Sequence, residues 1–575
     1  MLKRSHTLSD LLLITLISCA LYLPFLGGIA LFDWDEINFA ECAREMLITG
    51  NFSEVQLNFQ PFWEKPPLFI WLQVISMKLF GITEFAARFP NAICSIFTLS
   101  SLYLIGRKEI DRRMGWYWVL FYIGSLLPHF YFRTGIIDPW FNYFILIALY
   151  CFFKASGTQK NTLYFLLSGF FSGLAVLTKG PAALLIIAAT LSTYLIWTRQ
   201  LKKIILTSGF LFFSLSTLLV SGSWFLVMWL KGETSVIHSF ITYQLRLAQT
   251  KDAGHGGPFF YHFIILLIGC FPASLFFIAG YTRKESLPAA QVHLRYLFLS
   301  LFWTVLIIFS LVETKIVHYS SLCYFPLTFV AAQGFQRFVP LTFNTFHRAL
   351  YWFVAGLLFL ATTLVACSTY LLPLLIKSGL LEDKNTLAIL GAEVSRTGLE
   401  FLLPVLFITA AILIYKGLKE NKIMLQQSGL IFNGVFITAS IYWLVPLISG
   451  YTQDTAISFY RASAQQDCYL ETYKFKSYGY LFYGERQPRH YQNSDQQRSI
   501  SKQLDLMETE GHSRLESYAT ANSLWMVYGA IDKPAYIVAK SGNEKELLEQ
   551  KDIYKLYSQN GFSFFVRLPP NKHVK

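Results

Sequence analysis

The chain consists largely of long apolar segments that recur from residue 11 to residue 449 and are separated by short polar loops. Most of these segments are about 20 residues long, the length of a helix that crosses roughly 30 Å of hydrocarbon. Of the 575 residues, 54% are hydrophobic and only 14% are charged, which is too apolar for a soluble protein of this length. The alternating segments of about ten residues typical of an outer-membrane barrel are not the rule. The sequence therefore predicts a polytopic α-helical membrane protein.

Hydropathy predicts about thirteen membrane helices. The first apolar segment, residues 11–31, has a positive flank but lacks a small-residue cleavage site, so we expect it to be a retained helix and not a signal peptide. The expected helices lie near residues 11–31, 84–106, 115–130, 138–154, 162–178, 181–198, 204–230, 258–281, 295–312, 316–335, 349–376, 400–416 and 428–449.

The lysine and arginine residues gather in alternate loops between these segments. A net charge of +13 can indicate nucleic-acid binding, but here the cations form short clusters and no stripe, so we expect no nucleic-acid partner. The positive-inside rule makes the basic loops cytoplasmic. An odd number of crossings then places the C-terminus on the opposite, outer side, together with the loops 32–83, 231–257, 313–315 and 377–399.

The composition becomes polar and charged near residue 450. We therefore divide the chain into a transmembrane domain, residues 1–449, and a small soluble α/β domain, residues 450–575, which is large enough to hold its own core. Strand-like runs lie at 478–483, 535–538 and 562–566, and helical patterns at 500–508 and 545–557.

A dense set of acids follows the first apolar segment, where the chain leaves the bilayer. Asp35 and Glu36 open a predicted helix, in which Asp35 is a plausible N-cap and Glu36 lies in the favourable first turn. Because clustered acids raise one another's pKa, we favour a catalytic role here, above all for Asp35 as a base. The alternative is that these carboxylates cap and brace an interfacial helix. We favour that alternative for Glu41, Arg44 and Glu45, since Glu41 and Arg44 share one helix face and can pair.

The run Glu64-Lys65-Pro66-Pro67 is flanked by aromatic residues. Its two prolines stiffen the backbone and hold Lys65 in an extended segment. One interpretation is an aromatic interfacial anchor with a snorkelling lysine. The other is a preformed cation beside an acid, which suits a lipid-linked phosphate.

Further cations are expected on the outer side. Lys179 stands in a tight turn between two apolar helices, against the positive-inside expectation, so we expect it to meet an anion. Arg133 and Asp138 lie at the outer ends of consecutive helices and are further candidate site residues. The alternative is a surface ion pair, which would contribute little. Arg246 and Lys315 occupy two more outer loops. With Lys65, these cations predict a cavity that attracts anions.

Five motifs in a fixed order resemble those of a known family. They are Asp-Glu-x-x-x-Ala-Glu-x-x-Arg-Glu-Met from Asp35, Glu-Lys-Pro-Pro-Leu from Glu64, Arg-Phe-Pro from Arg88, Thr-Lys-Gly-Pro from Thr178 and Lys-x-x-x-Tyr from Lys315. This order is similar to that of the lipid A 4-amino-4-deoxy-L-arabinose transferases, which with the protein O-mannosyltransferases belong to the GT-C class of polyprenyl-phosphate-sugar-dependent glycosyltransferases. The resemblance covers roughly residues 20–335, and residues 473–477 resemble the outer domain of the family more weakly.

The resemblance implies a GT-C core of thirteen helices in the bacterial inner membrane, with a periplasmic C-terminal domain. It implies a polyprenyl-phosphate-linked sugar as donor, and lipid A, another envelope lipid or glycan, or a protein as acceptor. Asp35 matches the essential acid of the first outer loop, Glu64 and Lys65 match a Glu-Lys pair, and Tyr319 matches a tyrosine near the donor phosphate. Family members can bind zinc, which Glu64 and His255 would hold here.

The expected reaction moves a sugar from the lipid carrier to an outer-leaflet acceptor. A phosphate monoester leaves readily at neutral pH because its second pKa is about 6. Lys65, Arg246, Lys179 and Lys315 are the candidates to neutralise that phosphate, and Asp35 to act on the acceptor hydroxyl. Two alternatives stay open: a protein O-mannosyltransferase, or a lipid or solute transporter. A transporter would place its ionisable residues near the bilayer midplane and not at one face.

Overall fold

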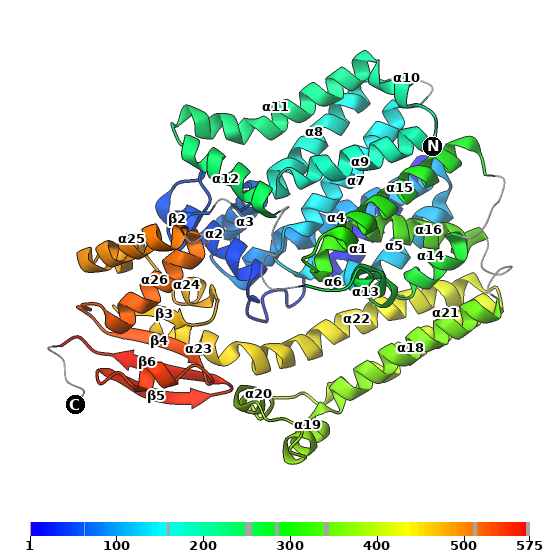
Figure 1. Cartoon of the computed structure of the whole chain (residues 1–575). Helices are drawn as coiled ribbons and strands as arrows, with labels where there is room; N and C mark the ends of the chain where they lie inside the picture. The colour runs from blue at the N-terminus through cyan, green and yellow to red at the C-terminus, as the bar shows by residue number, and fades with distance from the viewer. Residues whose placement is uncertain are drawn as a thin grey trace.

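The computed structural model of the chain describes residues 2–62, 64–157, 161–247, 256–281, 287–337, 344–509 and 514–570. Figure 1 shows a body of long helices, with a small sheet and its helices at one end. The N-terminus and helix α10 (Leu201–Ile205) lie at the other end of this body.

Long helices make up most of the chain between residues 2 and 452. The helices of this body, besides α10, are α1 (Leu2–Tyr22), α4 (Glu84–Glu109), α5 (Arg112–Ile123), α6 (Leu126–Phe130), α7 (Asp138–Ala155), α8 (Thr162–Lys179), α9 (Ala182–Trp197), α11 (Ser208–Leu230), α13 (Tyr261–Gly269), α14 (Ala273–Tyr281), α15 (Ala289–Leu311), α16 (Tyr324–Arg337), α18 (Thr345–Ala366), α19 (Ser368–Lys377), α21 (Leu402–Lys419) and α22 (Ile423–Thr452).

Among the described residues, seven helices are long and apolar enough to cross a membrane, and up to nine spans are found if each of two bent helix pairs is one span. One bent pair joins Leu126–Arg133 to Asp138–Ala155 at 115°, and the other joins Tyr261–Gly269 to Ala273–Tyr281 at 111°. Shorter apolar helices include His6–Tyr22 and Ala182–Trp197. The chain is thus a multi-pass helical membrane protein.

Side-chain caps fix several helix starts. Thr83 accepts a hydrogen bond from the backbone N–H of Ala86 at the start of α4, and Asp111 accepts one from Met114 at the start of α5. Such caps satisfy donors that the helix itself leaves unpaired. The α4–α5 turn also brings Gly106 and Gly115 so close that a Cβ on Gly106 would lie 2.9 Å from the Cα of Gly115. Small residues permit this close approach of membrane helices.

The first helix differs from the prediction. We expected residues 11–31, but α1 ends at Tyr22, and residues 23–34 form turns that lead into the first outer loop. Pro24 stands two residues after the end of the helix. A Cβ on Gly27 would meet the Phe85 Cβ at 2.9 Å, so this segment packs tightly against α4. Hydropathy alone does not separate such a buried apolar turn from a continuing helix.

The outer segments form smaller elements. These are α2 (Asp35–Thr49), the hairpin β1 (Gln56–Leu57) and β2 (Gln60–Pro61), α3 (Leu68–Phe80), η1 (Tyr131–Arg133), α12 (Thr234–Leu247), η2 (Val317–Cys323), α20 (Lys384–Leu390) and η3 (Leu399–Phe401).

Beyond α22 the described chain forms a four-stranded sheet in the order β3-β4-β6-β5, with β3 parallel to β4 and the other pairs antiparallel. The elements are α23 (Asp454–Ser463), β3 (Tyr469–Tyr473), α24 (Gly479–Phe482), η4 (Pro488–Tyr491), α25 (Ser494–Thr509), α26 (Arg514–Tyr528), β4 (Ala535–Lys540), α27 (Lys545–Leu548), β5 (Ile553–Gln559) and β6 (Phe562–Arg567).

The strands predicted at 535–538 and 562–566 and the helix at 500–508 are confirmed. Two predictions in this region are wrong. Residues 479–482 form the short helix α24 and not a strand, and the helix expected at 545–557 is helical only over Lys545–Leu548 and becomes strand β5 at Ile553. The Tyr483 hydroxyl accepts a hydrogen bond from Leu31 N at 2.6 Å, so contacts with the first outer loop outweigh the strand propensity of this tyrosine-rich run.

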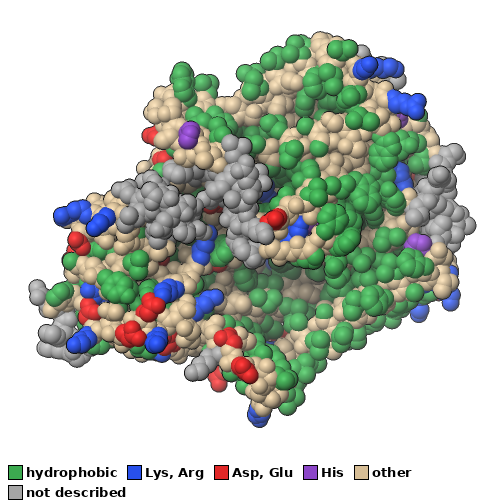
Figure 2. All heavy atoms as spheres, in the orientation of Figure 1, with side chains coloured by type: hydrophobic (Ala, Val, Ile, Leu, Met, Phe, Trp, Pro, Cys, Tyr) green, Lys and Arg blue, Asp and Glu red, His purple; other side chains and the backbone are tan. Residues whose placement is uncertain are grey.

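Figure 2 shows how side chains are distributed over one face of the molecule. Hydrophobic side chains cover the helical body, whereas acidic and basic side chains mix over the sheet at one end, and lysine and arginine stand at the opposite end. An apolar belt between two charged ends is the surface expected of a protein that spans a bilayer.

Candidate functional site

The first outer loop begins with α2, which carries the acids that the sequence singled out. Asp35 is the first residue of the helix, and Trp34 occupies the N-cap position without a side-chain hydrogen bond. Our prediction that Asp35 caps the helix is therefore wrong. The Asp35 side chain does not cap the helix, and it is 46% exposed.

Glu36, one residue further along, faces the interior. Its two oxygens accept from Arg88 Nε at 2.9 Å and Arg88 Nη2 at 2.8 Å, and also from the backbone N–H groups of Phe32 at 3.0 Å and Gly135 at 2.5 Å. Burial alone would raise the pKa of Glu36, but the Arg88 guanidinium and these backbone donors hold it below its ordinary value. Glu36 thus ties α2 to α4, which differs from the catalytic role that we predicted for it.

The same guanidinium also holds the turn segment before α2. Arg88 donates to the carbonyl oxygens of Leu26 at 3.1 Å, Ile29 at 2.8 Å and Ala30 at 3.0 Å. These are carbonyls that a continuing helix would have satisfied internally. Arg88 therefore makes the non-helical path into the site possible.

Glu41 and Arg44 brace α2 as predicted. Arg44 donates to both carboxylate oxygens of Glu41, at 2.7 and 2.6 Å, and to the carbonyl oxygen of Arg486 at 2.8 Å. Both side chains are buried. This pair fixes the first outer loop to the C-terminal part of the chain.

Four charged or titratable side chains meet in front of α2. His318, from η2, has its Nε2 3.7 Å from Asp35 Oδ2 and 3.9 Å from Asp138 Oδ2. Asp138, the first residue of α7, forms an ion pair with Lys179, the last residue of α8, at 2.7 Å. The series Asp35–His318–Asp138–Lys179 is the centre of the candidate site.

The sequence predictions included three of these four residues. Lys179 was expected to meet an anion, and Asp138 is that anion within the described part of the chain. His318 was not predicted as a site residue. Its place directly before Tyr319 in the Lys-x-x-x-Tyr motif, in an outer segment, was the signal that would have identified it.

Lys65 and Tyr319 border this centre. The positive charge of Lys65 acts on both the Asp138 carboxylate and the His318 ring, so Lys65 is within electrostatic range of the centre. The Lys179 ammonium group lies 5.4 Å from the ring centroid of Tyr319 and 5.5 Å from that of Phe141. Two cations and an aromatic wall thus stand beside two carboxylates.

Lys315 and Arg133 serve other contacts. The Lys315 ammonium group donates to the carbonyl oxygens of Phe309 at 3.1 Å, Ser310 at 2.8 Å and Val312, at the C-terminal end of α15. A lysine has three N–H donors, so this pattern differs from the phosphate-binding role that we predicted. Arg133 donates to the carbonyls of Leu21 at 2.7 Å and Pro24 at 2.8 Å, and so holds the end of α1.

Two predicted residues lie outside the described side chains. Arg246 belongs to α12, but its side chain is not among those described, and His255 lies outside the described residues. Over the part of the chain that is described, no three His, Cys, Asp or Glu side chains come together to hold a metal ion. The residues in view therefore do not complete the zinc site that Glu64 and His255 were expected to form.

The loop after β3 covers the start of α2. Asp33 accepts hydrogen bonds from the Ser477 hydroxyl and from Tyr478 N at 3.0 Å, and Trp34 Nε1 donates to the Lys476 carbonyl at 3.0 Å. Burial raises the pKa of Asp33, and these two donors oppose the rise. The segment just before Asp35 is thus held by the C-terminal part of the chain.

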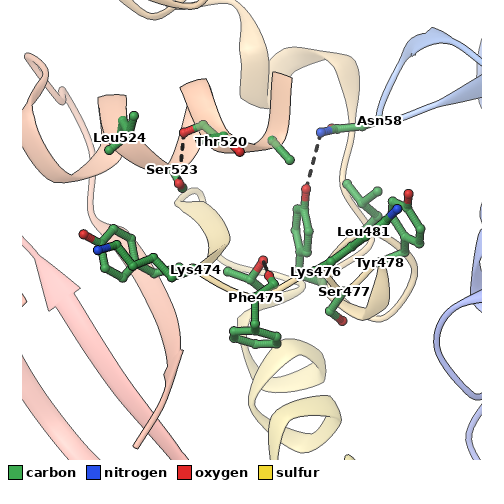
Figure 3. A pocket seen from close by; sticks show the side chains of 14 residues that line it. Asn58, Lys474, Phe475, Lys476, Ser477, Tyr478, Leu481, Thr520, Ser523 and Leu524 are labelled. Carbon is green, nitrogen blue, oxygen red and sulfur yellow. Dashed lines mark hydrogen bonds between the residues drawn. The ribbon is translucent and has the colours of Figure 1, made fainter. Parts of the chain in front are cut away.

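A pocket of about 440 Å³ lies beside this contact. Figure 3 shows the α26 residues Thr520, Ser523 and Leu524 on one side and the loop that carries Lys474 and Lys476 on the other. Asn58 reaches in from the first outer loop and donates to the Tyr480 hydroxyl at 3.4 Å. Residues of both the first outer loop and the C-terminal part of the chain therefore line the pocket.

Comparisons with known proteins agree with the motifs. The family model described as dolichyl-phosphate-mannose-protein mannosyltransferase matches residues 64–226. The undecaprenyl phosphate-alpha-4-amino-4-deoxy-L-arabinose arabinosyl transferase of Shewanella sediminis is 29% identical over 55% of this chain and 57% of its own length. The protein of the same name from Erwinia tasmaniensis is 30% identical over 56% and 58%. The chain thus matches little more than half the length of these relatives.

The fold is shared over nearly the whole chain. The crystal structure of ArnT from Cupriavidus metallidurans in the apo state superposes with a TM-score of 0.72 at 15% identity, covering 98% of this chain and 97% of that one. Its structure bound to undecaprenyl phosphate gives 0.71, with 99% of both chains covered. The chain is therefore similar in sequence to the aminoarabinose transferases and the protein mannosyltransferases, and it has the fold of a polytopic GT-C membrane protein.

Proposed function

We propose that the chain is an integral membrane glycosyltransferase. It moves a sugar from a polyprenyl-phosphate carrier to an acceptor at the outer face of the bacterial inner membrane, and that acceptor is lipid A or another envelope lipid or glycan. The observation that carries this proposal is the close approach of Asp35, His318, Asp138 and Lys179 at the start of α2. Asp138 and Lys179 lie within residues 64–226, which the mannosyltransferase family model matches.

The reaction needs positive charge where the carrier phosphate is released. Lys65 and Lys179 stand beside the carboxylates for this task, and Arg246 is proposed as a third cation from α12. Because Asp138 is paired with Lys179, we assign Lys65 the larger share of phosphate neutralisation. Tyr319, whose ring faces Lys179, forms the wall of the donor site.

Asp35 acts on the other reactant. Its half-exposed carboxylate is open to an acceptor hydroxyl, from which it takes the proton as the sugar is transferred. Where the acceptor is itself a phosphate, no base is needed, and Asp35 instead steadies the positive charge that develops on the sugar ring. His318 lies between Asp35 and Asp138, with its Nε2 3.7 and 3.9 Å from their carboxylate oxygens. No step is assigned to a metal ion.

The test is direct transfer. Membranes that contain the protein, supplied with an undecaprenyl-phosphate-linked aminopentose, should add that sugar to lipid A, and mass spectrometry of lipid A from deletion cells should show the modified species missing. Identical lipid profiles in wild-type and deletion cells, together with no transfer in membranes, would contradict the proposal.

A protein acceptor is the second candidate, favoured by the mannosyltransferase family model over residues 64–226. The same membranes supplied with a lipid-linked hexose distinguish the two. Label in the protein fraction, with none in the lipid fraction, would favour the protein O-mannosyltransferase alternative.

We further propose about thirteen crossings, a transmembrane domain over 1–449 and a periplasmic domain over 450–575. The N-terminus and α10, which both carry basic residues, lie at the end of the body opposite to the sheet. This arrangement supports the proposal that the basic loops lie on the same side of the membrane. A reporter fused after residue 575 should read out as periplasmic, and one inserted near Arg112 as cytoplasmic. The reverse result, or both reporters on one side, would remove the candidate site from the outer face.

A further inference from the structure

We propose that a groove between α1, α5 and α22 binds an anionic phospholipid in the membrane leaflet opposite to the candidate site. The groove has a volume of about 620 Å³ and lies between three helices of the membrane body. It shares no residue with the site described above, so the inference does not rest on the proposed function.

The walls of the groove are almost wholly apolar. Leu13 and Ile17 come from α1, Leu120 from α5, and Ile431 and Val435 from α22. Leu13, Ile431 and Val435 are 47%, 52% and 44% exposed, so these side chains lack protein packing on the open side. Within a bilayer such a surface is covered by hydrocarbon, and a concave surface favours an ordered acyl chain over a passing one.

The length of the groove matches one leaflet. Its lining runs from Asp10 to Leu21 along α1 and from Arg112 to Ile123 along α5. Eleven residues of helix rise about 17 Å at 1.5 Å per residue. This is close to half of a hydrocarbon core of roughly 30 Å, the depth that one acyl chain occupies.

One end of the groove is polar. Asp10 accepts hydrogen bonds from Arg112 Nε and Nη2, both at 2.7 Å, and from the Tyr103 hydroxyl, and Arg107 Nη1 lies 3.8 Å from it. The single carboxylate is thus already balanced by two guanidinium groups.

Arg113 is a third cation at this end, and it does not pair with Asp10. It lines the same end of the groove, is exposed, and has no ion-pair or hydrogen-bond partner among the described residues. An unpaired guanidinium at the head of an apolar groove is complementary to a lipid phosphate. Basic pockets between membrane helices bind anionic head groups in this way.

The polar end lies away from the candidate site. Along α1 the chain runs from Asp10 toward the turn segment that precedes Asp35, and along α5 from Arg112 toward Asp138. The head group therefore lies in the leaflet of the basic loops, and the acyl chain points toward the outer half of the bilayer.

The test is native mass spectrometry of the full chain in detergent, titrated with phosphatidylglycerol or with phosphatidylcholine of identical acyl chains. Wild-type protein should bind phosphatidylglycerol at least about fivefold more tightly, the effect expected of one cation near an anionic head group. Arg113→Gln should remove most of this preference while leaving phosphatidylcholine binding unchanged.

Two further variants separate the groove from general surface charge. Ala20 is exposed and lines the groove, so Ala20→Trp fills it and should reduce the binding of both lipids. Lys203→Gln removes an exposed cation from α10 and should change neither. Equal binding of the two lipids by the wild type, or the same loss in Lys203→Gln as in Arg113→Gln, would overturn the proposal. Unchanged lipid binding by folded Ala20→Trp would overturn it as well.

Discussion

Asp35→Asn is expected to lower sugar transfer by about 10²–10⁴-fold at equal protein level, the usual cost of losing a general base. The substitution keeps the shape of the side chain and removes its charge. Because Asp35 does not cap α2 and is 46% exposed, little of the folding energy depends on it. What remains of its structural role is the favourable effect of an acid in the first helical turn, about 0.3–1 kcal/mol. The initial rate of transfer in membranes supplied with lipid-linked donor is the measurement.

The matched control is Asp383→Asn in another outer loop. Asp383 is the exposed N-cap of α20 and accepts from Thr386 N at 2.8 Å. Asn caps about as well as Asp, so this variant should transfer sugar like the wild type. Lys65→Met is the companion on the donor side, since it keeps an unbranched chain and deletes the charge. Near-wild-type turnover in Asp35→Asn would return that residue to a structural role.

Much of the membrane body was predictable from the sequence. The helices expected at 138–154 and 162–178 are found at Asp138–Ala155 and Thr162–Lys179. Both carry a charged residue at the outer end, and hydropathy changes sharply there. The residues that bound these helices are also site residues, because Asp138 and Lys179 pair across the two helix ends. Where a membrane helix ends in a charge, the same signal therefore indicates both the boundary and the site.

The failures have a common cause in long-range contacts. The length of α1, the helix at α24 and the burial of Glu36 all depend on partners far away in the sequence, and the catalytic role of Glu36 stays a prediction. Glu36 looked like part of an exposed acid cluster, but Arg88, 52 positions further along, buries it. His318 was missed for the same reason, because its carboxylate neighbours come from α2 and α7. Periodicity and composition carry no information about such pairs.

Arg88→Met is the second variant with a large expected effect, here on folding. It leaves the buried Glu36 carboxylate without its counter-charge, and breaking a buried ion pair in this way costs about 3–5 kcal/mol. It also removes three donors from the carbonyls of Leu26, Ile29 and Ala30. We therefore expect a marked loss of folded protein in a heating series followed by size-exclusion chromatography in detergent.

The control for this variant is Arg461→Met. Arg461 also pairs with a glutamate, Glu84, but its side chain is 56% exposed, so its loss should cost no more than about 1 kcal/mol. A third variant, Glu36→Gln, measured in the same heating series and in the transfer assay, tests the role of Glu36. If Glu36 braces α2 against α4, Glu36→Gln should lose heat stability together with Arg88→Met, because the guanidinium is then buried without a carboxylate. If Glu36 instead took part in catalysis, Glu36→Gln would keep wild-type heat stability and lose turnover, as Asp35→Asn is expected to do. A stable and inactive Glu36→Gln protein would therefore move Glu36 from the scaffold back into the reaction.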